Sequence, residues 1–275
     1  MEDLLQLQLL ARQQRTPYAV ATIVEATGST PRTEGKMLVY ADGRSAGTIG
    51  GGNVEYQSQL LAAEVLRTGQ AIRCGKNRLV RYEVVPQAAA SGMACGGALQ
   101  VFIEVYGTRP LLVVCGGGHV GTCVLRAAKL TGFELWLFDD RSQEAVAEAA
   151  ALADRFFPVA GDFYEGIAAQ AVSPGAFFVI CGHSHTQDGE ALHAALEKDA
   201  AYVGMLGSRR KIAALFERLR SLGVPQAQLN TVCTPIGFDL GGETPEELAI
   251  AILAQILLVK NRGRQALTDA KEDKA

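Results

Sequence analysis

The sequence predicts an α/β protein in which a Rossmann-like, doubly wound parallel sheet follows a smaller α+β domain. From about residue 110, short continuous apolar runs alternate with helical segments, as in parallel strands that are covered on both faces. A glycine-rich loop directly follows the first of these runs. Earlier in the chain this alternation is absent. We therefore predict two domains, an N-terminal α+β domain at 1–107 and a Rossmann-like domain with a C-terminal helix at 110–275.

The elements of the Rossmann-like part follow from its apolar runs. Strands are expected over 111–115, 133–138, 176–181 and 201–206, with a short one around Phe156. Helices are expected near 120–131 and from about Ser142. Strands that alternate with helices imply right-handed crossovers, and therefore a parallel sheet.

The N-terminal part has a different pattern. Helices are expected over 3–14 and 53–68, and strands over 18–25, 79–85 and 99–105. In the stretch from Lys36 to Gly43, the Asp42-Gly43 pair indicates a hairpin turn. The sheet of this domain is expected to be antiparallel or mixed.

Composition narrows the class of protein. Hydrophobic residues make up 48% of the 275 residues and charged residues 20%, as in packed globular proteins. A net charge of −3 without a long basic run argues against nucleic-acid or membrane partners. The first residues lack the pattern of a signal peptide, and the most apolar segment, 248–259, is too short to span a bilayer. We therefore expect a cytoplasmic protein.

The segment Gly116-Gly-Gly118-His119-Val-Gly121 fits the GxGxxG pattern between a predicted strand and a predicted helix. The first glycine permits a tight turn, the second lets a phosphate approach the backbone, and the third lets the helix pack on the strand. Asp139 ends the next strand about twenty residues on, where a ribose hydroxyl is read. These residues predict a cofactor-binding loop, although the fold alone does not name the cofactor.

A second anion site is predicted after the strand that ends near Leu206. Ser208 is a suitable N-cap, and Arg209, Arg210 and Lys211 follow it at the start of a helix. Three cations at a helix start oppose the macrodipole unless an anion is present. The alternative is a solvated basic turn.

Further glycine clusters lie in the N-terminal part. Gly50, Gly51 and Gly52 precede Asn53 and a helix, so they either cradle a ligand or permit a close backbone crossing. Cys95 is flanked by glycines, and we predict that its thiol is accessible and functional. Cys74, Cys123 and Cys233 are expected to be small buried hydrophobes.

Two segments of the C-terminal part carry weaker signals. His183-Ser-His185 could be a pair of metal ligands, but no third ligand is evident, so we interpret the segment as an ordinary polar loop. Thr244-Pro-Glu-Glu247 combines a capping box with proline at the first helical position, and it predicts a helix start. The helix that follows is apolar around its circumference, so it is buried inside the monomer or at a contact between subunits.

Taken in order, several motifs together resemble the xanthine dehydrogenase accessory (XdhC/CoxI) family over nearly the whole chain. They are Gly28-Ser-Thr-Pro-Arg32, Gly47-Thr-Ile-Gly-Gly-Gly52, Cys95-Gly-Gly97, Cys115-Gly-Gly-Gly-His-Val-Gly121, Gly204-Met-Leu-Gly-Ser-Arg-Arg-Lys211 and Pro235-Ile-Gly-Phe-Asp-Leu-Gly-Gly-Glu-Thr-Pro-Glu-Glu247.

The resemblance implies a molybdenum-cofactor (molybdopterin) chaperone rather than an enzyme. Such a protein supports sulfuration of the cofactor with a cysteine desulfurase and inserts it into a xanthine dehydrogenase-type molybdenum hydroxylase. The glycine loops suit the anionic end of the cofactor, and the soft thiolate of Cys95 suits its molybdenum. Many relatives place a cysteine after the triple glycine, where this chain has Asn53. A homodimer is expected, because a second copy would shield a labile cofactor.

Two other functions remain open. An NAD(P)-dependent oxidoreductase would bind its dinucleotide with the loop from Gly116 to Gly121 and with Asp139. No convincing acid–base pair supports this alternative. A nucleotide-sensing regulatory module is the third hypothesis.

Overall fold

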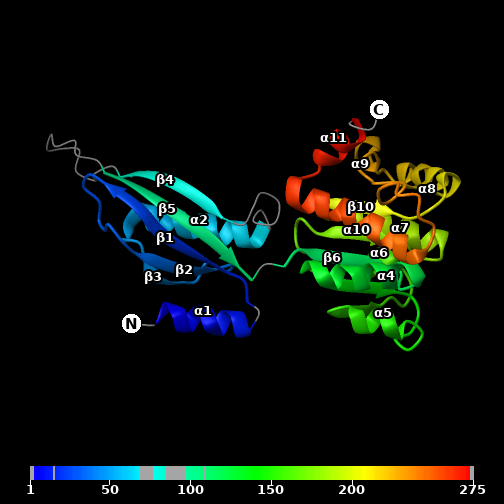
Figure 1. The fold of residues 1–275 in the computed structure, drawn as a ribbon, viewed down its shortest axis with the longest axis horizontal. Coiled ribbons are helices and arrows are strands. Elements are labelled where there is room, and N and C mark those ends of the chain that lie inside the picture. The colour runs from blue at the N-terminus through cyan, green and yellow to red at the C-terminus, as the bar shows by residue number, and fades with distance from the viewer. Residues whose placement is uncertain (1–2, 15, 69–76, 85–96, 108, 273–275) are drawn as a thin grey trace. The chain divides into compact units, whose positions relative to one another are not determined.

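The computed structural model describes residues 3–14, 16–68, 77–84, 97–107 and 109–272. The chain divides into two compact units, Met1–Thr108 (unit one) and Arg109–Ala275 (unit two). In the described residues each unit contains one five-stranded sheet (Figure 1).

Unit one has an antiparallel sheet in the order β3-β2-β1-β5-β4, so the antiparallel alternative is the one found. Its strands are β1 (Tyr18–Thr27), β2 (Lys36–Tyr40), β3 (Ser45–Thr48), β4 (Arg78–Val84) and β5 (Gly97–Tyr106). The predicted hairpin joins β2 and β3, and its Gly43 has a positive φ of 87°.

In the described part of unit one, helices α1 and α2 cover opposite faces of this sheet. Along β1, Ala19, Ala21 and Ile23 pack with α2 (Gly52–Thr68). Tyr18 and Val20 point to the other face, because side chains alternate along a strand, and they pack with α1 (Leu4–Gln13). The hydrophobic pattern of β1 thus places one helix on each face.

Unit two has a parallel sheet in the order β10-β9-β6-β7-β8. Its strands are β6 (Leu111–Cys115), β7 (Glu134–Asp139), β8 (Arg155–Pro158), β9 (Phe177–Ile180) and β10 (Tyr202–Met205). The predicted Rossmann-like fold is confirmed. The strand order reverses between β6 and β9, and ligands of open parallel sheets bind beyond the carboxyl ends of the strands at such a switch point.

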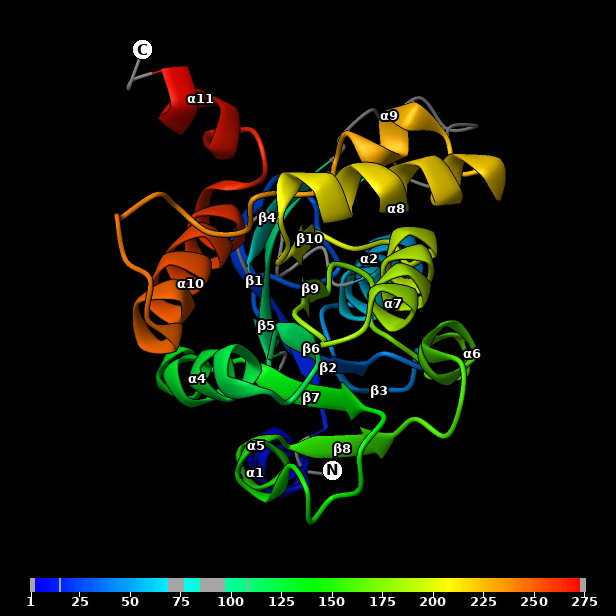
Figure 2. The ribbon, with the colours of Figure 1, turned by 90° about the vertical axis from the view of Figure 1, so that its right-hand side faces the viewer.

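Helices cover both faces of the parallel sheet, as Figure 2 shows. One face carries α4 (His119–Ala128), which continues into η1 (Lys129–Thr131), together with α5 (Ala147–Leu152) and α10 (Pro245–Arg262). The other carries α6 (Phe163–Ala168), α7 (His185–Glu197) and α8 (Arg209–Ser221). The short helices α9 (Gln226–Leu229) and α11 (Ala266–Glu272) complete the unit.

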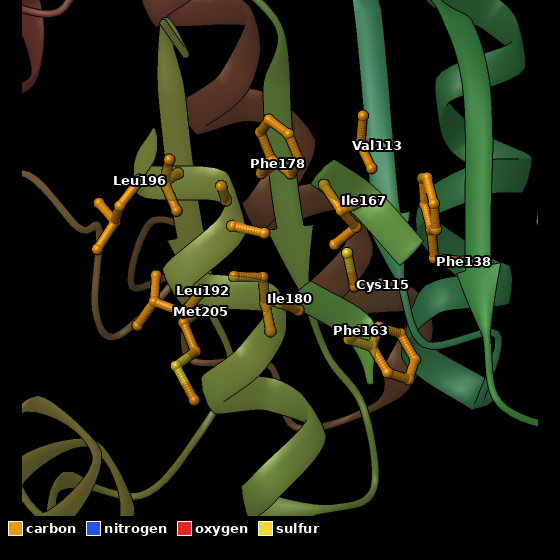
Figure 3. Packing of buried hydrophobic residues seen from close by; sticks show 14 of the residues in the cluster. Val113, Cys115, Phe138, Phe163, Ile167, Phe178, Ile180, Leu192, Leu196 and Met205 are labelled. Atoms are coloured by element: carbon orange, nitrogen blue, oxygen red, sulfur yellow. The ribbon is translucent and has the colours of Figure 1, made fainter. Parts of the chain in front are cut away.

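The core under α6, α7 and α8 is built from the buried runs that predicted the strands. Figure 3 shows Val113 and Cys115 of β6 beside Phe178 and Ile180 of β9, with Leu192 of α7 next to Ile180. All four strand residues are buried. This packing fixes the strand ends from which the loops of the candidate site emerge.

One predicted helix start was wrong. The helix expected from about Ser142 begins at Ala147, and residues 143–146 form turns. The N–H groups of Ala145 and Val146 both donate to the carbonyl of Ser142, at 3.0 and 3.3 Å. Just before this turn, Arg141 is tied to Asp139 through its backbone and its side chain, so the chain is held at the strand end.

Helix α10 begins where the capping box predicts. Thr244 Oγ1 accepts from Glu247 N–H at 3.3 Å, and Glu247 Oε2 accepts from Thr244 N–H at 3.1 Å. Most of its apolar residues are buried within unit two, and Ile250 is the exposed exception at 59%. Among the described residues, no helix is long and apolar enough to cross a membrane.

The polar residue inside this apolar helix has a structural role. Gln255 is buried, and its Oε1 accepts from the Tyr202 hydroxyl at 2.6 Å and from Gly237 N–H at 3.0 Å. Its Nε2 donates to the Gly237 carbonyl at 3.2 Å. Gln255 therefore fastens the turn at Gly237 to α10.

Candidate functional site

The carboxyl edge of the unit-two sheet brings most of the predicted site residues together. The glycine loop (Gly116–Gly121) follows β6, Asp139 ends β7, and Ser208 follows β10. Carboxyl ends of parallel strands meet at one edge of a sheet, so these segments share it. Gly50–Asn53 belongs to unit one, and Cys95 lies outside the described residues.

The glycines of the glycine loop have separate geometric roles. Gly116 has a φ of +108°, and a Cβ there would lie 2.8 Å from the carbonyl oxygen of Cys181. A Cβ on Gly121 would overlap the carbonyl oxygen of Gly116. The first and third glycines therefore permit close backbone approaches.

The middle of the glycine loop is open. No atom lies within 4 Å of a Cβ built on Gly118. Gly118 is the N-cap of α4, and no side chain caps this helix start. The first N–H groups of α4 therefore lack a capping side chain, and uncapped helix starts of this kind bind anions in Rossmann-type proteins.

A cleft of about 450 Å³ opens at this helix start. Its lining includes Gly117, Gly118, His119, Thr122, Arg126 and Arg141. His119 is exposed at the first position of α4. Glu148 and Glu246 also line the cleft, so it presents hydrogen-bond donors next to an uncapped helix start together with two carboxylates.

Asp139 lies beneath the cleft with its side chain 1% exposed. Its Oδ2 accepts from Gly117 N–H at 2.6 Å and from Arg141 Nη2 at 2.8 Å. Its Oδ1 accepts from the backbone N–H and the Nε of Arg141, at 2.9 and 2.8 Å. Burial alone would raise the pKa of Asp139, but these hydrogen bonds outweigh it and lower the pKa. Asp139 therefore holds the glycine loop as a carboxylate.

The second predicted anion site has an internal counterion. Ser208 caps α8 as predicted, and its Oγ accepts from Lys211 N–H at 3.3 Å. The Lys211 ammonium pairs with Asp188, which is 2% exposed and also accepts from Gly182 N–H at 2.9 Å. Arg209 and Arg210 remain exposed. Of the three cations, Lys211 is therefore neutralised by the protein itself.

A polar contact that the sequence did not indicate spans the switch point. Asp140 Oδ2 accepts from Gln187 Nε2 at 2.6 Å and lies 3.8 Å from His183 Nε2. Asp140 follows β7 and His183 follows β9, so the contact reaches across the end of β6. In the described part of the chain, no group of three His, Cys, Asp or Glu side chains is placed to hold a metal.

The described thiols differ in their surroundings. Cys123 is buried but lines the cleft, with Sγ 3.7 Å from Glu246 Oε1. Burial and the nearby Glu246 raise the pKa of Cys123, so it is a protonated thiol at neutral pH. Burial raises the pKa of Cys181 to about 12. Cys233 is only partly buried, and Cys74 lies outside the described residues.

The N-terminal glycine motifs converge in unit one. Gly50, Gly51 and Gly52, here called the glycine corner, all have positive φ, at 117°, 77° and 66°. A Cβ on Gly50 would lie 3.3 Å from Pro31 Cβ, whereas Gly51 and Gly52 face open space. Gly50 therefore packs closely against the side chain of Pro31, and a ligand role for Gly51 and Gly52 stays a prediction.

Gly97, the last residue of the Cys95-Gly-Gly97 motif and the first of β5, lies close to the Gly28–Arg32 segment that follows β1. A Cβ on Gly97 would lie 2.6 Å from the carbonyl oxygen of Ser29. Gly97 therefore packs against the Gly28–Arg32 segment, which also packs against the glycine corner.

Glu55 holds the glycine corner in shape. Its Oε2 accepts from the N–H groups of Ile49 and Gly51, at 2.9 and 3.0 Å, and from the Thr48 hydroxyl. Burial would raise the pKa of Glu55, but these hydrogen bonds lower it below its ordinary value. The sequence could have indicated this role, because Glu55 is an acidic residue in the first helical turn after a glycine-rich turn.

The lowered pKa of Glu55 predicts a pH-dependent contribution to stability. We expect Glu55→Gln to lower the free energy of unfolding by about 1–2 kcal/mol at neutral pH, because the charge-assisted hydrogen bonds are weakened. The contribution is present above the unfolded-state pKa and is lost as pH falls through the lower folded-state pKa. Urea denaturation at pH 7 and pH 3 measures it. A deficit of the same size at both pH values would contradict this account.

Fold and site together define a protein with a Rossmann-type unit whose glycine loop opens onto a cleft. The XdhC Rossmann domain profile matches residues 112–256, and the XdhC and CoxI family profile matches residues 11–83. The chain belongs to the XdhC and CoxI family.

Three curated proteins are similar to the chain. The uncharacterized protein YqeB of Escherichia coli K12 is 39% identical over 250 residues, which are 90% of this chain and 44% of YqeB. The molybdenum cofactor insertion chaperone PaoD of the same organism is 25% identical over 88% of this chain and 83% of PaoD. A probable xanthine dehydrogenase subunit of Bacillus subtilis is 26% identical over 59% of this chain and 46% of that protein. The chain thus spans less than half the length of YqeB and of the Bacillus subtilis protein.

A crystal structure of a xanthine dehydrogenase from Bacillus halodurans is also similar. It aligns over 96% of this chain and 97% of that chain, with 22% identity and a TM-score of 0.49.

Proposed function

We propose that this protein binds the molybdenum cofactor, supports its sulfuration, and delivers it to a molybdenum hydroxylase of the xanthine dehydrogenase type, without turnover of its own. Family membership supports this function, as does the similarity to the insertion chaperone PaoD. The observation that carries it is the uncapped start of α4 on the cleft, which suits the phosphate end of a pterin cofactor.

Under this proposal the ends of the cargo require different chemistry. The anionic end would bind at Gly118 and His119, where backbone N–H groups lie on the cleft. Molybdenum prefers soft ligands, and the thiolate of Cys95 is the ligand that the sequence predicts. Asn53 stands where many relatives have a cysteine, so a metal-ligand role in this chain would either fall to Cys95 or be absent. A cysteine desulfurase partner, a homodimer and a cytoplasmic location stay predictions.

The alternative is an NAD(P)-dependent oxidoreductase that uses the same glycine loop. Its expected ribose-reading residue, Asp139, already accepts four hydrogen bonds from Gly117 and Arg141. This engagement favours the chaperone function over an NAD enzyme.

Replacing Gly118 by valine tests the proposed function. The new side chain would fill the open space above the glycine loop, so we expect at least a roughly tenfold loss of molybdenum-cofactor affinity. The fold should be retained, because Gly118 has a φ of −75° that valine adopts readily. Titration of the purified protein with isolated cofactor and with NADH, alongside thermal unfolding, makes the measurement. A folded variant that binds the cofactor like the parent would refute the assignment, and turnover of NADH would favour the alternative.

A further inference from the structure

An ion pair occupies the place where a dinucleotide-binding Rossmann domain reads a ribose. In such domains an acid at the end of the second strand accepts a hydrogen bond from a ribose hydroxyl. Asp139 has that position, but each of its oxygens already accepts two N–H groups. A carboxylate oxygen has two lone pairs, so Asp139 retains no free acceptor site for a ribose.

Arg141 presents the donors at this place instead. A guanidinium has five N–H groups, and Arg141 uses Nε and Nη2 to bind Asp139 in a bidentate pair. Three N–H groups lie beyond that pair. The side chain is 39% exposed and lines the cleft together with Gly118 and His119. Because its partner is buried, the orientation of the guanidinium is set by the fold.

The other arginine of the cleft has a different setting. Arg126 pairs with Glu148, and both side chains are more than half exposed, at 52% and 63%. An exposed ion pair holds its side chains weakly. Arg126 also contacts the Cys123 sulfur, at 3.9 Å, but it has no buried carboxylate partner. It therefore lines the same cleft with a weaker anchor and provides a comparison for Arg141.

We infer that Arg141 determines the specificity of the cleft and makes it select a phosphate monoester over a ribose diol. A planar guanidinium held in place donates in the geometry that phosphate oxygens accept. The adjacent start of α4 supplies backbone donors to the same anion. The inference rests on the proposed function in that the pterin phosphate of the cargo is one such monoester. The 2′-phosphate of an NADP-type nucleotide is the other source.

Calorimetric titration of the full chain with four probes tests the inference. The probes are 6-hydroxymethylpterin phosphate, unphosphorylated 6-hydroxymethylpterin, NADP⁺ and NAD⁺. We expect the pterin phosphate to bind at least about tenfold more tightly than its unphosphorylated parent, since only the phosphate can accept charge-assisted hydrogen bonds from Arg141. Arg141→Gln should bring this ratio close to one, whereas Arg126→Gln, which removes a guanidinium held by an exposed ion pair, should lower the ratio much less. Arg141→Lys, which keeps a cation beside Asp139, should give an intermediate ratio.

The outcomes separate the inference from the proposed function. Pterin binding without any advantage from the phosphate would overturn the inference and leave the proposed function standing. The inference would also be overturned if both folded Arg141 variants kept the parent's ratio of affinities for the phosphorylated and unphosphorylated pterin. Preference for NADP⁺ over NAD⁺, lost in Arg141→Gln and without binding of the pterin phosphate, would support the inference and count against the proposed function. Failure of all four probes to bind would overturn the inference.

Discussion

Replacing Gly121 by alanine is expected to lower the free energy of unfolding of unit two by at least about 3 kcal/mol. The added Cβ would overlap the carbonyl oxygen of Gly116 and lie 3.2 Å from Cys181 Sγ. Neither neighbour can withdraw easily. Gly116 is packed from behind by the backbone of Cys181 and Gly182, and Cys181 is buried. A domain of ordinary stability would lose a large part of its folding free energy.

Gly118→Ala is the matched control for this experiment. It adds the same methyl group to the same glycine loop, but no atom lies within 4 Å of the new Cβ. We expect a change of at most about 0.5 kcal/mol. Thermal and urea denaturation of both variants would measure the difference. Equal stabilities for the two variants would show that α4 does not depend on a glycine at 121 to approach β6.

Replacing Lys211 by methionine is expected to cost about 3–5 kcal/mol of stability. The change leaves the carboxylate of Asp188, which is 2% exposed, without its cation. The remaining hydrogen bond from Gly182 N–H, at 2.9 Å, cannot replace the lost charge. The substitution would destabilise the first turns of both α7 and α8, because Asp188 lies on α7 and Lys211 on α8.

A double variant, measured by the same urea denaturation, distinguishes the ion pair from simple packing. Asp188→Leu combined with Lys211→Met removes both charges and should recover much of the lost stability, as buried pairs replaced by apolar residues often do. Arg210→Met removes an exposed cation from the same helix turn, and it should change stability by at most about 0.5 kcal/mol. Equal losses for Lys211→Met and Arg210→Met would contradict the role given to Asp188.

The strands and loops were predictable because their signals are local. The apolar run Leu111–Cys115, the GxGxxG spacing and the position of Asp139 depend on neighbours in sequence, and they placed β6, α4 and β7 correctly. The start of α5 was not predictable in the same way. In the folded chain Asp139 binds Arg141, a turn closes on the carbonyl of Ser142, and the helix begins only at Ala147.

The chemistry of the site depends on pairings between segments far apart in sequence. Lys211 was correctly placed after an N-cap, but its partner Asp188 is 23 residues earlier and sits in another helix. Likewise, the contact between Asp140 and His183 exists only because β7 and β9 flank β6. A single sequence carries no signal of which charges will meet, so it could suggest free cations where the structure places ion pairs.

The bond pattern around Glu55 has a consequence for how unit one would receive and release a ligand. Its carboxylate satisfies the N–H groups of Ile49 and Gly51 within the protein, so the glycine corner keeps its shape when empty. Ordering a residue costs about 1–2 kcal/mol in backbone entropy, and for these glycines that cost is incurred during folding rather than at binding. Such a corner is preorganised. A ligand that binds there could arrive and depart without a conformational transition, and its residence time would be set by its own contacts alone.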